Sequence, residues 1–269
     1  MFGAIIGDIV GSVYEWNSIK TREFPLFSPS SDFTDDSVMT VAIASAILRS
    51  RREDVSFREA AVQEMQAFGR RHPHRGYGGS FSRWILSDRP EPYGSYGNGS
   101  AMRVSPVGLI AASLDAALSM AADSAEVTHN HPEGIKGAMA VAGAVYLART
   151  GAEKEDIRQF LRERFYPMDK TLDEIRPGYH FDVTCQGSVP EALTAFLESD
   201  SYEDAVRGAV SLGGDSDTQA AIAGSVAWAW YGREGLTEDM LKLRKEAERR
   251  LPEDMLSVIY DFEKMTAIC

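Results

Sequence analysis

The chain has 269 residues, 44% of them hydrophobic, which suits one large domain or two small ones. A formal net charge of −12 argues against a broad basic surface for nucleic acid. Two cysteines, Cys185 and Cys269, are too few for a disulfide framework or a cysteine-based zinc site, and they fit a reducing cytoplasm. No linker-like stretch divides the chain, so we expect residues 1–269 to form a single domain. No sequence feature predicts the oligomeric state.

The N-terminal segment, residues 1–15, is predicted to be a helix. Gly3, Gly7 and Gly11 recur every four residues, which places them on one helix face where another helix can approach closely. A strand is the alternative, since Ile and Val favour strands. The helix prediction puts Glu15 at its C-terminal end. Asp8 interrupts the apolar run, which therefore does not have the form of a signal peptide.

The segments that follow have helical periodicity almost throughout. Capping-box sequences predict helix starts at Ser56 and Ser188, and a third start is expected at Ser201. A loop is expected over 16–32, another with exposed His72 and His74 over 72–80, and irregular structure over 166–187. The predicted helices cover 37–52, 56–71, 81–86, 101–122 with a possible break near Pro106, 133–149, 153–165, 188–197, 201–212, 216–231, 238–250 and 252–264.

No alternating strand pattern is found, so the predicted fold is a compact all-α bundle in one domain. The longest apolar stretch, 104–122, contains Pro106 and Asp115 and is rich in alanine. We therefore expect a buried core helix there and no membrane span. Together with the cysteine usage, this predicts a cytoplasmic protein without a membrane partner.

Two acidic clusters stand directly before apolar helices. One carboxylate there is an ordinary cap, but a second in the same turn needs a cation or a donor nearby. Hard oxygen ligands suit Mg²⁺ or Mn²⁺, and four carboxylates brought together could hold two ions about 3.5–4 Å apart. Two unrelated capped helices are the alternative, because periodicity does not show that the clusters meet. The clusters comprise Thr34, Asp35 and Asp36, and Asp215, Asp217 and Thr218.

A glycine-rich loop and a histidine precede two further helices. The loop amides and the following helix N-terminus suit a phosphate or pyrophosphate, and Tyr93 or Tyr96 could stack on a base. A plain turn is the alternative. His129 could contact substrate hydroxyls or a metal, or transfer a proton, whereas a capping histidine is the structural alternative. The loop consists of Ser95, Tyr96, Gly97, Asn98 and Gly99.

Taken together, these motifs resemble the ADP-ribosylglycohydrolase family. The resemblance covers most of the chain, with the motifs in the family's order. It implies a compact all-α fold with a binuclear Mg²⁺ centre at the base of a cleft. The motifs are Gly7-Asp8-Ile9-Val10-Gly11 leading to Glu15, Thr34-Asp35-Asp36-Ser37, the stretch from Ser95 to Arg103, His129 with Pro132, and Gly213-Gly214-Asp215-Ser216-Asp217-Thr218.

The same resemblance implies a role for each site residue. Glu15 corresponds to an acidic residue near the metals and the scissile bond, and His129 to a ribose or phosphate contact. The loop from Ser95 to Gly99 would hold the pyrophosphate. The implied metal ligands are Thr34, Asp35, Asp36, Asp215, Asp217 and Thr218.

The implied reaction is hydrolysis of the bond between ADP-ribose and an acceptor, on free ADP-ribose adducts or ADP-ribosylated protein. ADP-ribosyl-arginine on protein is the favoured substrate, and O-linked ADP-ribose (serine, O-acetyl or polymer) is the alternative. Either Glu15 or Asp215 would be the base, and the sequence does not separate them. A non-catalytic ADP-ribose-binding or crystallin-like protein and a two-metal phosphohydrolase are further alternatives. The complete ligand set favours the enzyme.

Overall fold

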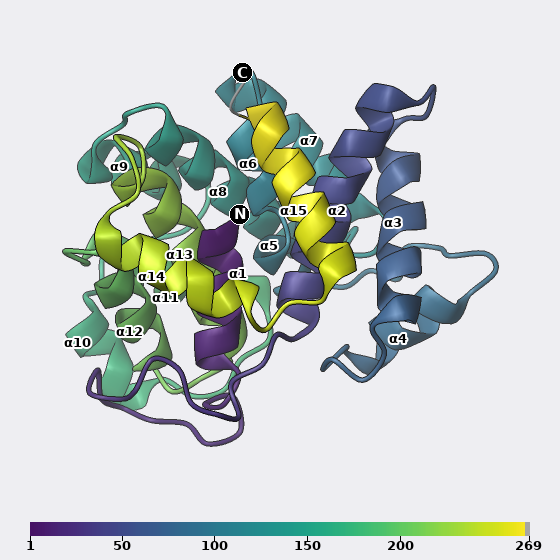
Figure 1. The fold of residues 1–269 in the computed structure, drawn as a ribbon. Helices are drawn as coiled ribbons and strands as arrows, with labels where there is room; N and C mark the ends of the chain where they lie inside the picture. Colours follow the sequence, from purple (N-terminus) through teal and green to yellow (C-terminus); the bar gives the residue numbers. More distant parts are fainter. Residues whose placement is uncertain (267–269) are drawn as a thin grey trace.

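The computed structural model describes residues 1–266, so Cys269 lies outside the described part. These residues form helices α1 to α15 and one 3-10 turn, η1, and they contain no β-strand beyond an isolated bridge between Gly97 and Thr184 (Figure 1). The all-α prediction is confirmed. The first eight helices are α1 (Phe2–Gly11), α2 (Asp35–Arg52), α3 (Phe57–Arg71), α4 (Gly79–Leu86), α5 (Gly99–Met102), α6 (Ser105–Ile110), α7 (Leu114–Glu126) and α8 (Pro132–Arg149). The remaining elements are α9 (Lys154–Arg164), α10 (Leu172–Ile175), η1 (Arg176–Gly178), α11 (Cys185–Leu197), α12 (Tyr202–Val210), α13 (Ser216–Tyr231), α14 (Glu238–Glu248) and α15 (Glu253–Thr266).

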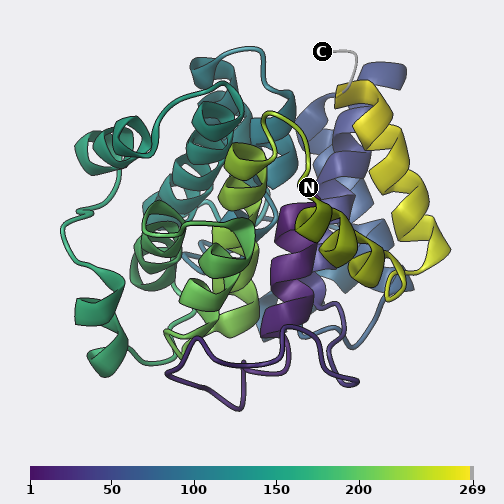
Figure 2. The same cartoon turned by 60° about the vertical axis from the view of Figure 1, so that its left-hand side comes forward.

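Helix α1 lies at the centre of the molecule and packs along α13 (Figures 1 and 2). All of its residues are buried. A Cβ on Gly7 would lie 2.1 Å from the Ala220 carbonyl oxygen, so the two helices touch backbone to backbone. The predicted close approach is confirmed, and the strand alternative is wrong. The helix ends at Gly11, so the prediction that Glu15 ends it is wrong, and Glu15 lies in the turn that follows.

The helices that carry the acidic clusters both begin beside α1. Thr34 caps α2, and its hydroxyl accepts the Asp36 amide at 3.3 Å. Before α13, Gly213 has φ +67°, a left-handed conformation that glycine adopts at little cost, and Asp215 is the N-cap. Both helix starts therefore lie against the C-terminal half of α1.

The helix predicted over 101–122, with a possible break near Pro106, is interrupted twice: the break near Pro106 is confirmed, and a second break before Leu114 was not expected. The chain forms three shorter helices there, α5, α6 and α7. Pro106 lies in the first turn of α6, where its missing N–H is tolerated, and the Ser113 hydroxyl caps α7 by accepting the Ala116 amide at 3.1 Å. Among residues 1–266 no helix is both long and apolar enough to cross a bilayer.

Three other local predictions are wrong. The helix expected from Ser188 begins earlier, because the Thr184 hydroxyl caps α11 by accepting the Gly187 amide at 3.1 Å, and Pro190 then lies inside the helix. The segment 166–187, expected to be irregular, contains α10 and η1. His72 is not freely exposed, since its Nε2 lies 2.9 Å from an Asp254 oxygen. His74 is exposed as expected.

Candidate active site

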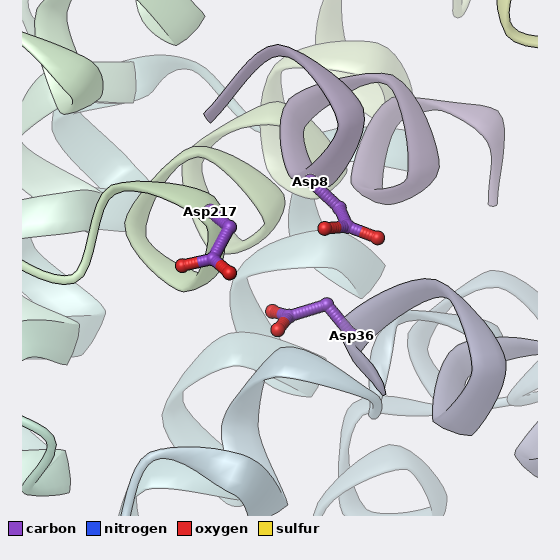
Figure 3. Close-up of side chains that lie close together, drawn as sticks. All are labelled: Asp8, Asp36 and Asp217. Atoms are coloured by element: carbon purple, nitrogen blue, oxygen red, sulfur yellow. The ribbon is translucent and has the colours of Figure 1, made fainter. Parts of the chain in front are cut away.

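The two acidic clusters meet in space. Figure 3 shows Asp8, Asp36 and Asp217 pointing toward one another from α1, α2 and α13. One carboxylate oxygen from each lies within 4.8 Å of the others, and Glu15, Asp215 and Asp217 form a second group that meets the same limit. Asp217 belongs to both groups. The alternative of two unrelated capped helices is therefore wrong.

Burial and mutual repulsion dominate the electrostatics of this cluster. Burial, followed by the charge of Asp217, raises the pKa of Asp35 and of Asp36 well above its ordinary value. Burial and the charge of Asp215 do the same for the pKa of Asp217. Burial also raises the pKa of Asp8 and of Asp215 to about 6. No Lys or Arg is among the main influences on any of these groups in the described chain.

The donor atoms fit a hard divalent cation. Asp36 is buried, and its Oδ1 has no hydrogen-bond partner within the described residues. The donors that converge are carboxylate and hydroxyl oxygens, the ligand types preferred by Mg²⁺ and Mn²⁺. Repulsion among buried carboxylates is relieved when a cation sits between them. The arrangement can thus bind a divalent metal.

Asp8 is a site residue that the sequence reasoning did not assign. It is fully buried, and it accepts hydrogen bonds from the Thr34 amide at 2.9 Å and the Thr34 hydroxyl at 2.7 Å. The Ser37 amide at 3.0 Å and the Ser37 hydroxyl also donate to it. Asp8 therefore fixes the N-terminus of α2 against α1. The available signal was a carboxylate inside an otherwise apolar helix.

The two threonines connect the clusters. Thr218 Oγ1 donates to Asp36 Oδ2 at 3.2 Å, which joins the start of α13 to the start of α2. Thr34 Oγ1 lies 3.4 Å from the same Asp36 oxygen but donates at 2.7 Å to Asp8. Thr218 lines the cavity above the cluster, whereas Thr34 does not.

A cavity of about 340 Å³ opens above the carboxylates. It brings together most of the residues predicted from sequence, with one clear exception in the glycine-rich loop. Tyr96 is 48% exposed, does not line the cavity, and faces the His131 ring at 5.2 Å. The predicted residues that line the cavity are Glu15, Asp35, Asp36, Ser95, Gly97, Asn98, Gly99, His129, Asp215, Asp217 and Thr218. Lining residues that were not predicted include Gly76, Phe81, Met102, Arg103 and Val183.

The glycine-rich loop is tied to the acidic cluster through Asn98. The Asn98 side-chain amide donates to Asp215 Oδ2 at 2.7 Å and to the Ser188 hydroxyl at 3.2 Å. Its backbone amide donates to the Val183 carbonyl at 2.8 Å, and the Gly97 amide donates to Ser95 Oγ at 3.1 Å. These two loop amides are already engaged, so an anion held here must use other donors.

His129 is buried at the wall of the cavity. Burial, followed by the charge of Arg103, holds its pKa well below the ordinary value, so the ring is neutral. Arg103 donates to the Thr128 hydroxyl at 2.9 Å, and that hydroxyl lies 2.7 Å from His129 Nδ1. This chain of contacts favours the tautomer with its proton on Nε2. His131 instead caps α8, since its Nδ1 accepts the Glu133 amide at 3.1 Å.

Glu15 stands on the wall of the cavity in the turn after α1, and it is half-buried. Burial, then repulsion by Asp217, raises its pKa to about 7, while the adjacent Trp16 side chain acts in the opposite direction. A carboxylate with that pKa can accept a proton and release it again near neutral pH. Of the two predicted bases, Glu15 is the more accessible, because Asp215 is buried and bonded to Asn98.

The carboxylate floor and polar wall of this cavity suit a hydrolase, and the family match below defines it as one that acts on glycosyl bonds. The chain belongs to the ADP-ribosylglycohydrolase family, whose model matches residues 1–264. It is 28% identical to the ADP-ribosylhydrolase ARH3 of Bos taurus, over 88% of this chain and 85% of that protein. It is also 28% identical to the ADP-ribosylarginine hydrolase Tri1 of Pseudomonas putida (strain GB-1), over 90% of this chain and 72% of the relative.

The fold is also similar to a solved structure. A chain of the "ADP-ribosylglycohydrolase-related protein complex" superimposes with a TM-score of 0.67 at 24% identity, covering 96% of this chain and 94% of that one. At this level of identity the likeness concerns the fold alone. It agrees with the all-helical architecture expected of the family.

Proposed function

We propose that the protein hydrolyses the bond between ADP-ribose and an acceptor in an Mg²⁺-dependent reaction, with ADP-ribosyl-arginine on protein as its principal substrate. The observation that carries this proposal is the convergence of two acidic helix N-termini at the floor of the cavity without a neutralising Lys or Arg. The names of the relatives, ADP-ribosylhydrolase and ADP-ribosylarginine hydrolase, support the substrate class.

Two Mg²⁺ ions, or Mn²⁺ in their place, would be held at the carboxylate floor. Bound ions of this kind orient sugar hydroxyls and lower the pKa of a bound water. Asp8 would hold its neighbours in place, because it accepts four hydrogen bonds from Thr34 and Ser37. The proposed ligands are Thr34, Asp35, Asp36, Asp215, Asp217 and Thr218.

The remaining residues would bind the substrate and move a proton. Glu15 would take the proton of the attacking water as the ribose acquires oxocarbenium character, which its pKa of about 7 supports. The Nε2–H of neutral His129 would donate to a ribose or phosphate oxygen. The loop of Ser95, Tyr96, Gly97, Asn98 and Gly99 would hold the pyrophosphate. Its donors would be the Ser95 hydroxyl and the backbone amides of Tyr96 and Gly99, since the Gly97 and Asn98 amides are engaged within the protein.

The extent of the catalytic unit is part of the proposal. We treat residues 1–269 as one ADP-ribosylglycohydrolase domain. The family match over residues 1–264 supports this, as does the packing of α1 on α13 and of α2 on α15, which joins the two ends of the described chain. O-linked ADP-ribose remains the alternative substrate, because the name of Tri1 specifies arginine as the acceptor whereas that of the equally similar ARH3, an ADP-ribosylhydrolase, specifies none.

The test is a direct comparison of substrates. Purified protein is incubated with Mg²⁺ and a peptide carrying ADP-ribose on arginine, a peptide carrying it on serine, or O-acetyl-ADP-ribose. Free ADP-ribose is measured by chromatography and inorganic phosphate is measured in parallel. We expect ADP-ribose from the arginine peptide, no phosphate, and loss of the activity with a chelator. Phosphate as the product, or no ADP-ribose from any substrate, would contradict the proposal.

A further inference from the structure

Two exposed aromatic side chains stack on each other close in sequence to residues that line the cavity. Trp16 is 77% exposed and Phe181 is 45% exposed, with ring centroids 5.5 Å apart and an angle of 26° between the planes. Glu15 and Val183, which line the cavity, are one and two residues away along the chain. Single exposed apolar side chains are common, but a stacked pair beside a cavity marks a binding surface.

The two segments that carry these rings are joined to each other. Trp16 belongs to the loop between α1 and α2, and Phe181 to the segment between η1 and α11. The Lys20 ammonium group donates to the carbonyl oxygens of Arg176 at 2.9 Å and of Tyr179 at 2.6 Å, which ties the first loop to the second. The pair is therefore held before any ligand arrives, and little conformational entropy is lost on binding.

The residues next to the pair in the chain are acidic. Glu15 precedes Trp16, and the half-buried Asp182 follows Phe181. The nearby Lys20 is directed at backbone carbonyl oxygens and does not neutralise them. Aromatic faces flanked by carboxylates attract a planar cation, and guanidinium stacks on such faces better than a compact ammonium does. A neutral hydroxyl acceptor gains nothing from this surface.

We propose that Trp16 and Phe181 form the acceptor-binding platform, on which the guanidinium group of ADP-ribosyl-arginine stacks while ADP-ribose occupies the cavity. The inference rests on the proposed function and specifies how its acceptor is recognised. The scissile bond must lie within reach of Glu15, and Trp16 is its immediate neighbour. The acceptor therefore leaves the cavity over Trp16, whereas the pyrophosphate follows the wall formed by Ser95 to Gly99.

The first experiment measures steady-state kinetics of the Mg²⁺-loaded wild type, Trp16→Ala and Phe181→Ala on the arginine-linked and serine-linked peptides. Leu241→Ala, on α14 and 43% exposed, is the matched control. For Trp16→Ala we expect about a tenfold higher KM for the arginine-linked peptide, between the sizes of an exposed and a desolvated cation–π contact. Because the Trp16 side chain also acts on the pKa of Glu15, any change in kcat should be the same for both peptides and should also occur in Trp16→Phe. KM for the serine-linked peptide and inhibition by ADP-ribose should not change, and Leu241→Ala should have the kinetic constants of the wild type. Trp16→Phe should keep KM for the arginine-linked peptide close to that of the wild type.

Three results would overturn the platform. The first is an unchanged KM for the arginine peptide in Trp16→Ala. The second is an equal rise in KM for both peptides. The third is weaker inhibition by ADP-ribose, which would mean that the adenine base and not the acceptor stacks on Trp16.

A second measurement does not depend on turnover. Trp16 is the exposed member of the tryptophans in the described chain, so arginine methyl ester should quench the fluorescence of the wild type and not that of Trp16→Phe. Absence of this difference would also contradict the platform. If the wild type releases no ADP-ribose from any substrate, the proposed function fails, whatever the quenching shows. If release occurs but Trp16→Ala does not discriminate between acceptors, only the platform fails.

Discussion

The two ends of α1 handle charge in opposite ways. Near its N-terminal end, Arg244 lies over the Phe2 ring at 4.3 Å and forms ion pairs with Glu248 at 2.9 Å and Glu263 at 2.8 Å. Near its C-terminal end, Asp8 lies with Asp36 and Asp217, all buried and without a basic partner in the described chain. At the first end the charges are neutralised by ion pairs within the protein, whereas at the second the carboxylates remain to be neutralised by a bound cation.

The difference separates charges that stabilise the fold from charges that bind a ligand. The partly exposed ion pairs around Arg244 each contribute little, and their loss is tolerated. The buried carboxylates cost free energy in the metal-free protein, so they are expected to persist only because a ligand uses them. The predictions below test the contrast, from the largest expected effect to the smallest.

Replacing Asp217 should have the largest effect, because this residue belongs to both carboxylate groups. We expect Asp217→Ala to lower ADP-ribose release by about a thousandfold or more, in keeping with the loss of a metal-dependent step. Its circular dichroism spectrum should be unchanged. Asp239→Ala is the matched control, since Asp239 also stands in the first turn of a helix, α14, but is exposed. Near-normal turnover in Asp217→Ala would remove the metal assignment.

The stability of the metal-free protein should fall as the pH rises from about 4 to about 7. The pKa of Asp8 is raised from 3.8 to about 6, so the folded state binds more protons than the unfolded chain in this range. Asp8 alone corresponds to about 3 kcal/mol at 1.36 kcal/mol per pKa unit. Urea unfolding with chelator, repeated across this range, measures the change. Added Mg²⁺ should reverse the slope, and a metal-free protein that gains stability with pH would contradict the prediction.

Removing Asp8 should disconnect α2 from α1. We expect Asp8→Ala to lower the free energy of unfolding of the Mg²⁺-bound protein by about 2 kcal/mol, since several donors lose their acceptor. Mg²⁺ affinity, measured by calorimetry, should weaken about tenfold, because Asp8 accepts hydrogen bonds from Thr34 and so orients this proposed ligand. Ser37→Ala removes only one of these donors and should have a smaller effect on both quantities. Unchanged Mg²⁺ affinity would show that Asp8 does not position the cluster.

At the opposite end of α1, replacing Arg244 should matter least. We expect Arg244→Met to lower the free energy of unfolding by about 1 kcal/mol, because its ion pairs are partly exposed and its aliphatic stem continues to cover Phe2. Turnover and Mg²⁺ affinity should equal those of the wild type. A large loss of activity in this variant would mean that the two ends of α1 are coupled.

Much of the fold could be predicted from periodicity and caps. The starts of α2, α3, α8 and α13 follow from local signals, such as the Ser56 cap and Pro132 at a first helical position. The Ser188 prediction failed because Thr184, four residues earlier, offered an equally good cap and Pro190 was tolerated inside the helix. Over 101–122 the break near Pro106 was expected, but the second break, before the Ser113 cap, was missed because buried short helices look like one apolar run.

The site was predictable in its parts but not in its geometry. The residue types at Asp36 and Asp217 indicated hard ligands, yet only the packing of α1 on α13 brings them together. Asp8 could not be assigned because its role depends on donors from Thr34 and Ser37, which are distant in sequence. Tyr96 was expected to face the ligand, but its ring turns toward His131 instead.

The contact between α1 and α13 also has a consequence for how the protein is made. As the chain is synthesised, α1 emerges first, and the helix that covers its glycine face, α13, emerges near the end. The entropy of closing so long a loop must be lost before the contact is gained, so such pairings form late in folding. Until then, the glycine face of α1, which packs on α13, is not covered by that helix. The carboxylate cluster is thus completed last, and unpaired like charges are brought together only when the rest of the fold can hold them.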